Sequence, residues 1–170
     1  QTNRVALLQV RQGIAARAQW FARNYPDSRY TVNAYYIKAA TLDTRLEAER
    51  LIRDRKLAHY RAFPVEQSRH SWEMVLENWP ESPMAAVAML RLAQLDARAG
   101  RLDQAVELMK QLAQVDPDSV MAHTNLSRFY QQKGLIDEAE AEQAEARRLS
   151  WKAELKAKKT MVGAQHAVPL

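Results

Sequence analysis

The sequence predicts an all-α fold, an α-solenoid of antiparallel helix pairs with about seven or eight helices, in which one unit is enlarged. The first observation is an internal repeat, because Gly100–Ala105 reads G-R-L-D-Q-A and Gly134–Ala139 reads G-L-I-D-E-A. The spacing from Gly100 to Gly134, which we call the repeat period, is typical of stacked helix–turn–helix units. The second is composition, because a chain with 47% hydrophobic residues and only four glycines favours helices. The sequence contains no long run of alternating β-branched residues, so we expect no sheet.

A recurring tripeptide, Pro-Asp/Glu-Ser, is the third observation. Proline ends the incoming helix, and the acidic residue and serine are expected to cap the next helix. The tripeptide occurs at Pro26-Asp27-Ser28, Pro80-Glu81-Ser82 and Pro117-Asp118-Ser119. These boundaries predict a leading helix in 1–25, an enlarged repeat over 26–80, and repeats over 81–119 and 120–150. Residues 151–170 are expected to form a helix extension and a tail.

The leading helix is expected over residues 4–23, where apolar residues recur at helical spacing. Its apolar face is predicted to contain Ile14, Ala18 and Phe21, and Trp20 is expected to pack on the next unit. Pro26 ends it.

The enlarged unit begins a helix near Tyr30 and is about 20 residues longer than the repeat period. An apolar stripe over 42–60 fits either one long bent helix or two helices with a kink near Asp43. A second helix is expected over Val65–Asn78, with Trp72 and Val75 inward.

Two regular units follow. In the first, a helix over 84–99 is expected to end in a turn at Gly100, because glycine tolerates the left-handed backbone past a helix end. Asp103 is expected to cap the next helix. The last helix is expected to end at about Lys159.

The two regular units resemble tetratricopeptide repeats. The pattern positions of that family are occupied here by Met89, Leu92, Ala93, Gly100, Ala105, Met109 and Pro117, and again by His123, Leu126, Ser127, Tyr130, Gly134, Ala139 and Ala146. The chain departs from the pattern at Asp96, Met109, Leu112 and Gln143. The resemblance implies stacked helical hairpins that bind a protein partner.

A second likeness covers residues 24–82. The segment N-Y-P-D-S-R-Y-T-V-N-A at 24–34, with N-W-P-E-S following at Asn78, is similar to repeats of bacterial outer-membrane assembly lipoproteins and Tol–Pal coordinators. The likeness implies the cell envelope or periplasm, with the cytoplasm as the alternative. The lipid-anchoring cysteine of the lipoproteins has no counterpart, because the chain contains no cysteine.

Charge and motif content exclude several function classes. The net charge of +5 fits either solvated helix faces or an acidic partner. No module typical of nucleic-acid binding appears, which argues against a nucleic-acid partner. No nucleophile motif, phosphate-binding loop or metal-binding histidine spacing is found, so we expect no catalytic residue, metal or cofactor. No apolar run approaches the roughly 20 residues of a transmembrane helix.

The expected partner surface is the concave face, which the first helix of each repeat lines. Exposed positions there predict contacts from Asn33, Tyr36, Gln94, Arg98, Thr124, Asn125, Arg128 and Gln131. The enlarged unit carries a basic cluster that is either a mixed-charge surface helix or a docking surface: Arg45, Arg50, Arg53, Arg55, Lys56 and Arg61.

The sequence therefore predicts a non-catalytic scaffold or assembly subunit of a larger bacterial complex, which binds one or more proteins through the concave groove or an outer helix face. Two alternatives stay open, a helical-repeat appendage of an enzyme and an RNA-binding helical-repeat protein.

Overall fold

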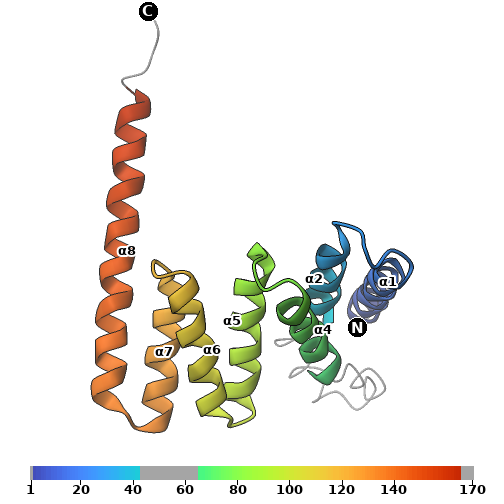
Figure 1. Ribbon diagram of the computed structural model, residues 1–170, viewed down its shortest axis with the longest axis horizontal. Helices are drawn as coiled ribbons and strands as arrows, with labels where there is room; N and C mark the ends of the chain where they lie inside the picture. Colours follow the sequence, from blue (N-terminus) through green and yellow to red (C-terminus); the bar gives the residue numbers. More distant parts are fainter. Residues whose placement is uncertain (1, 43–64, 166–170) are drawn as a thin grey trace, which may run out of the picture. The chain divides into compact units, whose positions relative to one another are not determined.

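The computed structural model describes residues 2–42 and 65–165, and all regular secondary structure in these ranges is helical (Figure 1). This confirms the predicted all-α fold. The chain divides into two compact units, residues 1–92 and 93–170, with the boundary inside α5. The described helices are α1 (Thr2–Asn24), α2 (Thr31–Leu42), α4 (Val65–Asn78), α5 (Pro83–Arg98), α6 (Leu102–Val115), α7 (Val120–Lys133) and α8 (Ile136–Gln165).

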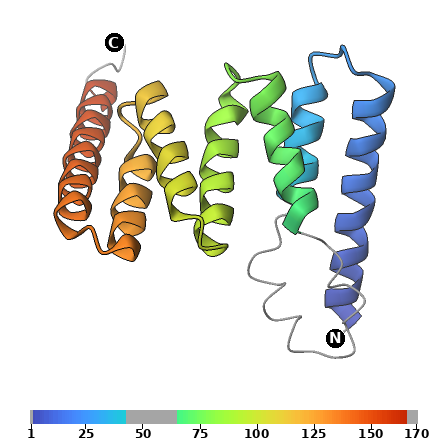
Figure 2. The same cartoon turned by 60° about the horizontal axis from the view of Figure 1, so that its bottom comes forward.

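In the first unit, α1 and α2 form an antiparallel hairpin (Figure 2). Ala18 and Ala22 of α1 are buried with Ala34 of α2, and Phe21 and Tyr35 pack against this cluster. Small side chains let two helix axes approach closely, so alanine rather than a large residue forms this contact.

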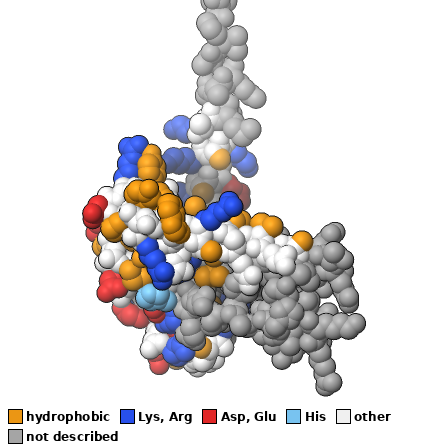
Figure 3. Space-filling view, turned by 90° about the vertical axis from the view of Figure 1, so that its right-hand side faces the viewer, with side chains coloured by type: hydrophobic (Ala, Val, Ile, Leu, Met, Phe, Trp, Pro, Cys, Tyr) orange, Lys and Arg blue, Asp and Glu red, His pale blue; other side chains and the backbone are white. Residues whose placement is uncertain are grey.

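The expected apolar face of α1 is partly wrong. Ile14 and Trp20 are exposed, Trp20 at 58%, whereas Ala15, Ala18 and Ala22 are buried. The helix turns its small residues toward α2, and the Trp20 ring instead lies edge-on to Tyr25 at 5.9 Å. Figure 3 views the side of the molecule where α1 and α2 lie, and hydrophobic side chains are visible at the surface beside basic ones.

Helices α2 and α4 pack together in the same unit. The predicted helix over Val65–Asn78 is confirmed, and Trp72 and Val75 are buried as expected. The Trp72 ring meets Tyr36 edge-on at 5.5 Å, and Ser68 Oγ donates a hydrogen bond to the Ala39 carbonyl at 3.2 Å. The apolar stripe beyond Leu42 and the choice between one helix and two lie outside the described residues.

The two glycine turns of the second unit are confirmed. Gly100 and Gly134 have φ of 78° and 76°, in the left-handed region that favours glycine. At the second turn the Leu135 N–H donates to the Tyr130 carbonyl at 2.9 Å, which satisfies a carbonyl left free at the end of α7. The Gly134 turn reverses the chain and allows α8 to pack back on α7.

The predicted side-chain caps are wrong at α5, α6 and α7, whereas before α2 the Tyr30 N–H donates to Ser28 Oγ at 3.3 Å. Ser119 is the N-cap of α7 but its side chain makes no capping hydrogen bond. Ser82 Oγ is buried and has no hydrogen-bond partner among the described residues. Asp103 lies in the first turn of α6, after the N-cap Arg101, and its carboxylate pairs with Lys133. An acidic residue in this turn still favours the positive end of the helix dipole.

Helix α8 is longer than predicted and extends to Gln165, well past the end of α7 (Figure 1). Its residues 151–160 are all exposed. Alanine, lysine, glutamate and leucine dominate this part, and their high helix propensity explains why the helix continues without tertiary packing. Across the described ranges, no helix combines the length and apolar character that crossing a bilayer requires.

Candidate interaction groove between α7 and α8

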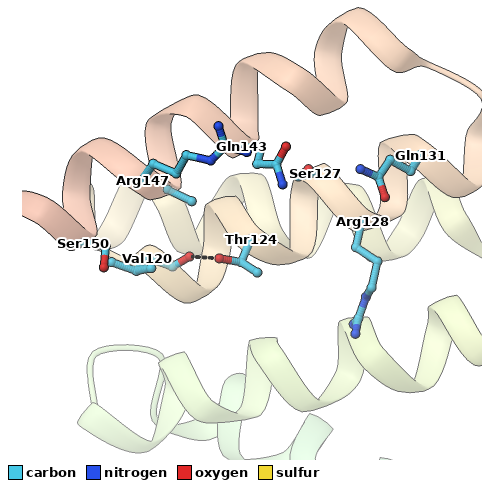
Figure 4. A pocket seen from close by; sticks show the side chains of 9 residues that line it. Val120, Thr124, Ser127, Arg128, Gln131, Gln143, Arg147 and Ser150 are labelled. Atoms are coloured by element: carbon cyan, nitrogen blue, oxygen red, sulfur yellow. Dashed lines mark hydrogen bonds between the residues drawn. The ribbon is translucent and has the colours of Figure 1, made fainter.

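A groove of about 410 Å³ lies along the α7–α8 hairpin of the second unit (Figure 4). Helix α7 contributes side chains from its first turn to its last, and α8 contributes side chains from its middle. The lining residues are Val120, Thr124, Ser127, Arg128, Gln131, Gln143, Ala146, Arg147 and Ser150. We call this site the α7–α8 groove.

The hairpin that builds the groove is held by a buried apolar seam. Leu126 and Phe129 of α7 are almost fully buried, as are Ala139 and Leu149 of α8. One polar contact also joins the helices, because His123 Nδ1 lies 2.6 Å from Glu142 Oε2. These contacts fix the helix pair, so the groove is built on rigid elements rather than on loops.

Small buried residues form the floor of the groove. Ser127 of α7 and Ala146 of α8 are both buried. The residues around them are longer and mostly polar, with Arg128 and Gln131 on the α7 side and Gln143 and Arg147 on the α8 side. Because the side chains of the floor are small and those on either side are longer, the backbone of another polypeptide can approach the floor closely.

The charge of the groove is positive, because two arginines and no carboxylate line it. Arg128 Nη2 donates to Asn125 Oδ1 at 2.7 Å, and its guanidinium lies 5.2 Å from the Phe129 ring centroid. Among the described residues, no hydrogen bond or ion pair engages the side chains of Arg147, Gln131 or Gln143.

The neighbouring Arg148 differs from Arg147. Its guanidinium is paired with Glu145 on the exposed side of α8. This hydrogen bond holds the pKa of the Glu145 carboxyl below its ordinary value. Arg147 is therefore the arginine of this pair whose guanidinium faces the groove with all its donors available.

The chemistry available in the groove is hydrogen-bond donation to anionic or polar groups. Guanidinium groups bind carboxylates through charge-assisted bonds, and the glutamine amides both donate and accept. Thr124 Oγ1 already donates to the Val120 carbonyl at 2.7 Å. The lining residues include no histidine or carboxylate that would act as a general base on a hydroxyl.

Three of the predicted partner-binding residues, Thr124, Arg128 and Gln131, line this groove together. The expectation that the Asn125 side chain is exposed is wrong, since its exposed fraction is 4%. Its Nδ2 donates to the Met121 carbonyl at 2.7 Å, and its Oδ1 accepts from Arg128. The buried Asn125 side chain thus holds the Arg128 guanidinium in place.

The other predicted partner-binding residues lie elsewhere. Asn33 is exposed on α2, and Tyr36 is half-buried against Trp72 in the first unit. Gln94 is half-buried and Arg98 is exposed on α5, and neither lines the groove. The basic cluster between Arg45 and Arg61 lies outside the described residues.

The sequence interpretation missed the α8 side of the groove. The signal was present in the repeat, because Met109 and Ala113 stand one repeat period before Gln143 and Arg147. Apolar residues in one repeat are thus replaced by polar ones at the equivalent positions of the next. Such a replacement is typical of a surface that stays exposed, as this one does among the described residues.

Residues 96–149 match the sequence profile of the tetratricopeptide repeat family, and this range includes the greater part of the groove. Among solved structures, a crystal structure of MamA is similar at a TM-score of 0.56 and 18% identity, covering 89% of this chain and 79% of that one. A second, titled MamA RS-1 ArsTM double mutant, has a TM-score of 0.49 and 16% identity, with coverage of 86% and 96%. A comparison with curated protein sequences finds no match. The first similarity is one of fold.

Proposed function

We propose that this chain is a non-catalytic protein-interaction scaffold and that a partner protein binds in the α7–α8 groove. The observation that supports this most directly is the lining itself, in which two arginines and two glutamines surround a floor of small residues without any carboxylate. Such a surface offers directional donors on a rigid helical hairpin, which suits recognition of a polypeptide.

The proposal includes membership of a larger assembly in the bacterial cell envelope or periplasm. Its support is the tetratricopeptide-type fold together with the Tyr25-Pro26-Asp27-Ser28 motif and its spacing to Pro80. Fractionation of the source cells, with detection of this chain by antibody, tests the compartment. Recovery with cytoplasmic proteins would favour the cytoplasmic alternative.

Capture from an extract of the source organism tests the scaffold role. The chain has no cysteine, so Lys110→Cys at an exposed position of α6 gives a single attachment point away from the groove. We expect a few proteins to be retained in fixed stoichiometry. Arg147→Glu should reduce their recovery at least about tenfold, because reversing a charge inside an interface opposes the partner's charge.

Arg148→Glu is the matched control, since it makes the same charge change one residue away, outside the groove. Recovery should stay within about twofold of the parent, because surface charges away from an interface are screened. Loss of the captured material on nuclease treatment would identify an RNA-binding protein instead. Equal losses with both variants would remove the groove from the proposal.

A further inference from the structure

We infer that the occupant of the α7–α8 groove is an acidic amphipathic helix of a partner protein, seated on α8 as α7 is seated on α6. This inference rests on the proposed function and specifies the partner's chemistry. The internal repeat carries it, because a shift by one repeat period relates the groove to a place in the same unit where a helix already lies.

The equivalent surface on α6 is covered by a helix. Met109 and Leu112 of α6 are buried, and α7 packs on α6 in the unit formed by residues 93–170. A shift by one repeat period carries Met109, Leu112 and Ala113 to Gln143, Ala146 and Arg147, which form the α8 side of the groove. By this relation the groove has the shape of a helix seat.

The α7 side obeys the same relation. Ser127, Arg128 and Gln131 stand one repeat period after Ala93, Gln94 and Ala97 of α5. The small residue that forms the floor is retained, as serine in place of alanine, and it is buried in both repeats. On the wall, Gln94 is replaced by Arg128 and Ala97 by Gln131, so the floor stays small while the rim becomes more polar and more basic.

The described part of the chain places no helix of its own in this seat. After Ser150, α8 runs straight on to Gln165 with exposed side chains through residue 160, instead of turning back into a further hairpin. The groove runs from Val120 to Gln131, twelve residues of helix, which span about 17 Å at a rise of about 1.5 Å per residue. An occupying helix of about three turns would span it.

Charge decides what kind of helix fits. Arg128 and Arg147 stand on opposite walls, and no carboxylate lines the groove to neutralise them. An occupying helix therefore requires acidic residues on its flanks, where they reach the two guanidinium groups, and small or apolar residues toward Ser127 and Ala146. Electrostatic complementarity of this kind disfavours a basic helix of the same shape.

The probe for this inference is the repeat's own seated helix. A capped, fluorescent peptide with the sequence of residues 120–133 carries Arg128→Glu and Lys133→Glu, which changes its charge from +2 to −2 because only these two residues are charged in the segment with histidine neutral. Anisotropy titration against the full chain should give saturable binding. Arg147→Glu in the chain should weaken it at least about tenfold, whereas Arg148→Glu should change it by less than about twofold.

The unsubstituted peptide, with charge +2, is the control and should bind at least about tenfold more weakly than the acidic one. Equal binding of both peptides, or no saturable binding of the acidic peptide up to about 1 mM, would overturn the inference. If capture of proteins still depends on Arg147 in that case, the scaffold proposal stands and only the helical occupant is rejected. An Arg147-dependent dimer in sedimentation would identify a second copy of this chain as the occupant and also overturn the inference.

Discussion

Helices α6 and α8 hold equivalent places in successive repeats, yet α7 packs on α6 whereas α8 continues into solvent with residues 151–160 exposed. Both follow a left-handed glycine, and both keep the same alanine, Ala105 or Ala139, buried in the seam of their hairpin. The two helices differ on the face where the next helix would pack, because α6 has Met109 at the position where α8 has Gln143. The glycine turn and the buried alanine therefore form the hairpin in both repeats, whereas the residue at the Met109 or Gln143 position decides whether the outer surface stays exposed.

The largest effect is expected from Met109→Gln, which gives α6 the residue that α8 has. Met109 has no exposed surface, so the variant loses a packed apolar side chain and buries an amide without partners. We expect the free energy of unfolding to fall by at least about 3 kcal/mol, measured by urea denaturation with circular dichroism. The reciprocal Gln143→Met changes an exposed wall and should stay within about 0.5 kcal/mol. Similar losses in both variants would mean that the two faces do not differ in burial.

An intermediate effect is expected at the feature that the two repeats share. Gly134→Ala has free space around its new Cβ, so its cost comes from the left-handed backbone at φ 76°. We expect a loss of about 1–2 kcal/mol in the free energy of unfolding. Gly13→Ala, inside α1 and also with free space, should instead gain about 0.5–1 kcal/mol because alanine is the better helix former. A gain from Gly134→Ala would contradict the shared turn geometry.

The smallest effect concerns the ion pair that joins the α6–α7 turn to the exposed part of α8. Lys152 Nζ lies 2.8 Å from Asp118 Oδ1, and this hydrogen bond holds the pKa of the Asp118 carboxyl below its ordinary value of 3.8. The folded state therefore binds this proton less tightly than the unfolded chain. The contribution to stability is present above about pH 3.8 and is lost as the pH falls through the lowered pKa.

Hydrogen exchange of the amides in α8 near Lys152 reads out this small contribution. We expect Asp118→Asn to speed exchange there at neutral pH in low salt, and we expect little difference from the parent in high salt, where exposed charges are screened. Lys152→Met should give the same pattern, and the double variant should add nothing further. Additive effects of the two substitutions would show that the pair is not coupled.

The parts of the fold that depend on local signals were predictable from the sequence. Glycines one repeat period apart located both turns, and Pro64 and Pro80 flanked a helix whose bounds were confirmed. The α1 face was not predictable in full, because periodicity favours large residues such as Ile14 and Trp20 while close helix packing selected alanines. The Asp103 cap failed because α6 begins before it, at Leu102, and its carboxylate pairs with Lys133, which is distant in the sequence.

Half of the groove was predictable and half was not. The helical register of α7 identified Thr124, Arg128 and Gln131. Asn125 follows Thr124 by one residue, so it lies about 100° further round the helix axis, inside the hairpin, and is buried. The α8 side depends on whether a further helix covers it, which the pattern of a single unit does not encode. Comparing two units shifted by one repeat period supplies that information.

Because helix α8 is uninterrupted, it is a spacer as well as one side of the α7–α8 groove. From Ser150, where the groove ends, to Gln165 the helix rises by about 22 Å at about 1.5 Å per residue. Because the helix is continuous, Gln165 lies at a set distance from the α7–α8 groove. In the proposed complex, the helix that carries Arg147 therefore also sets the distance between the bound helix and Gln165.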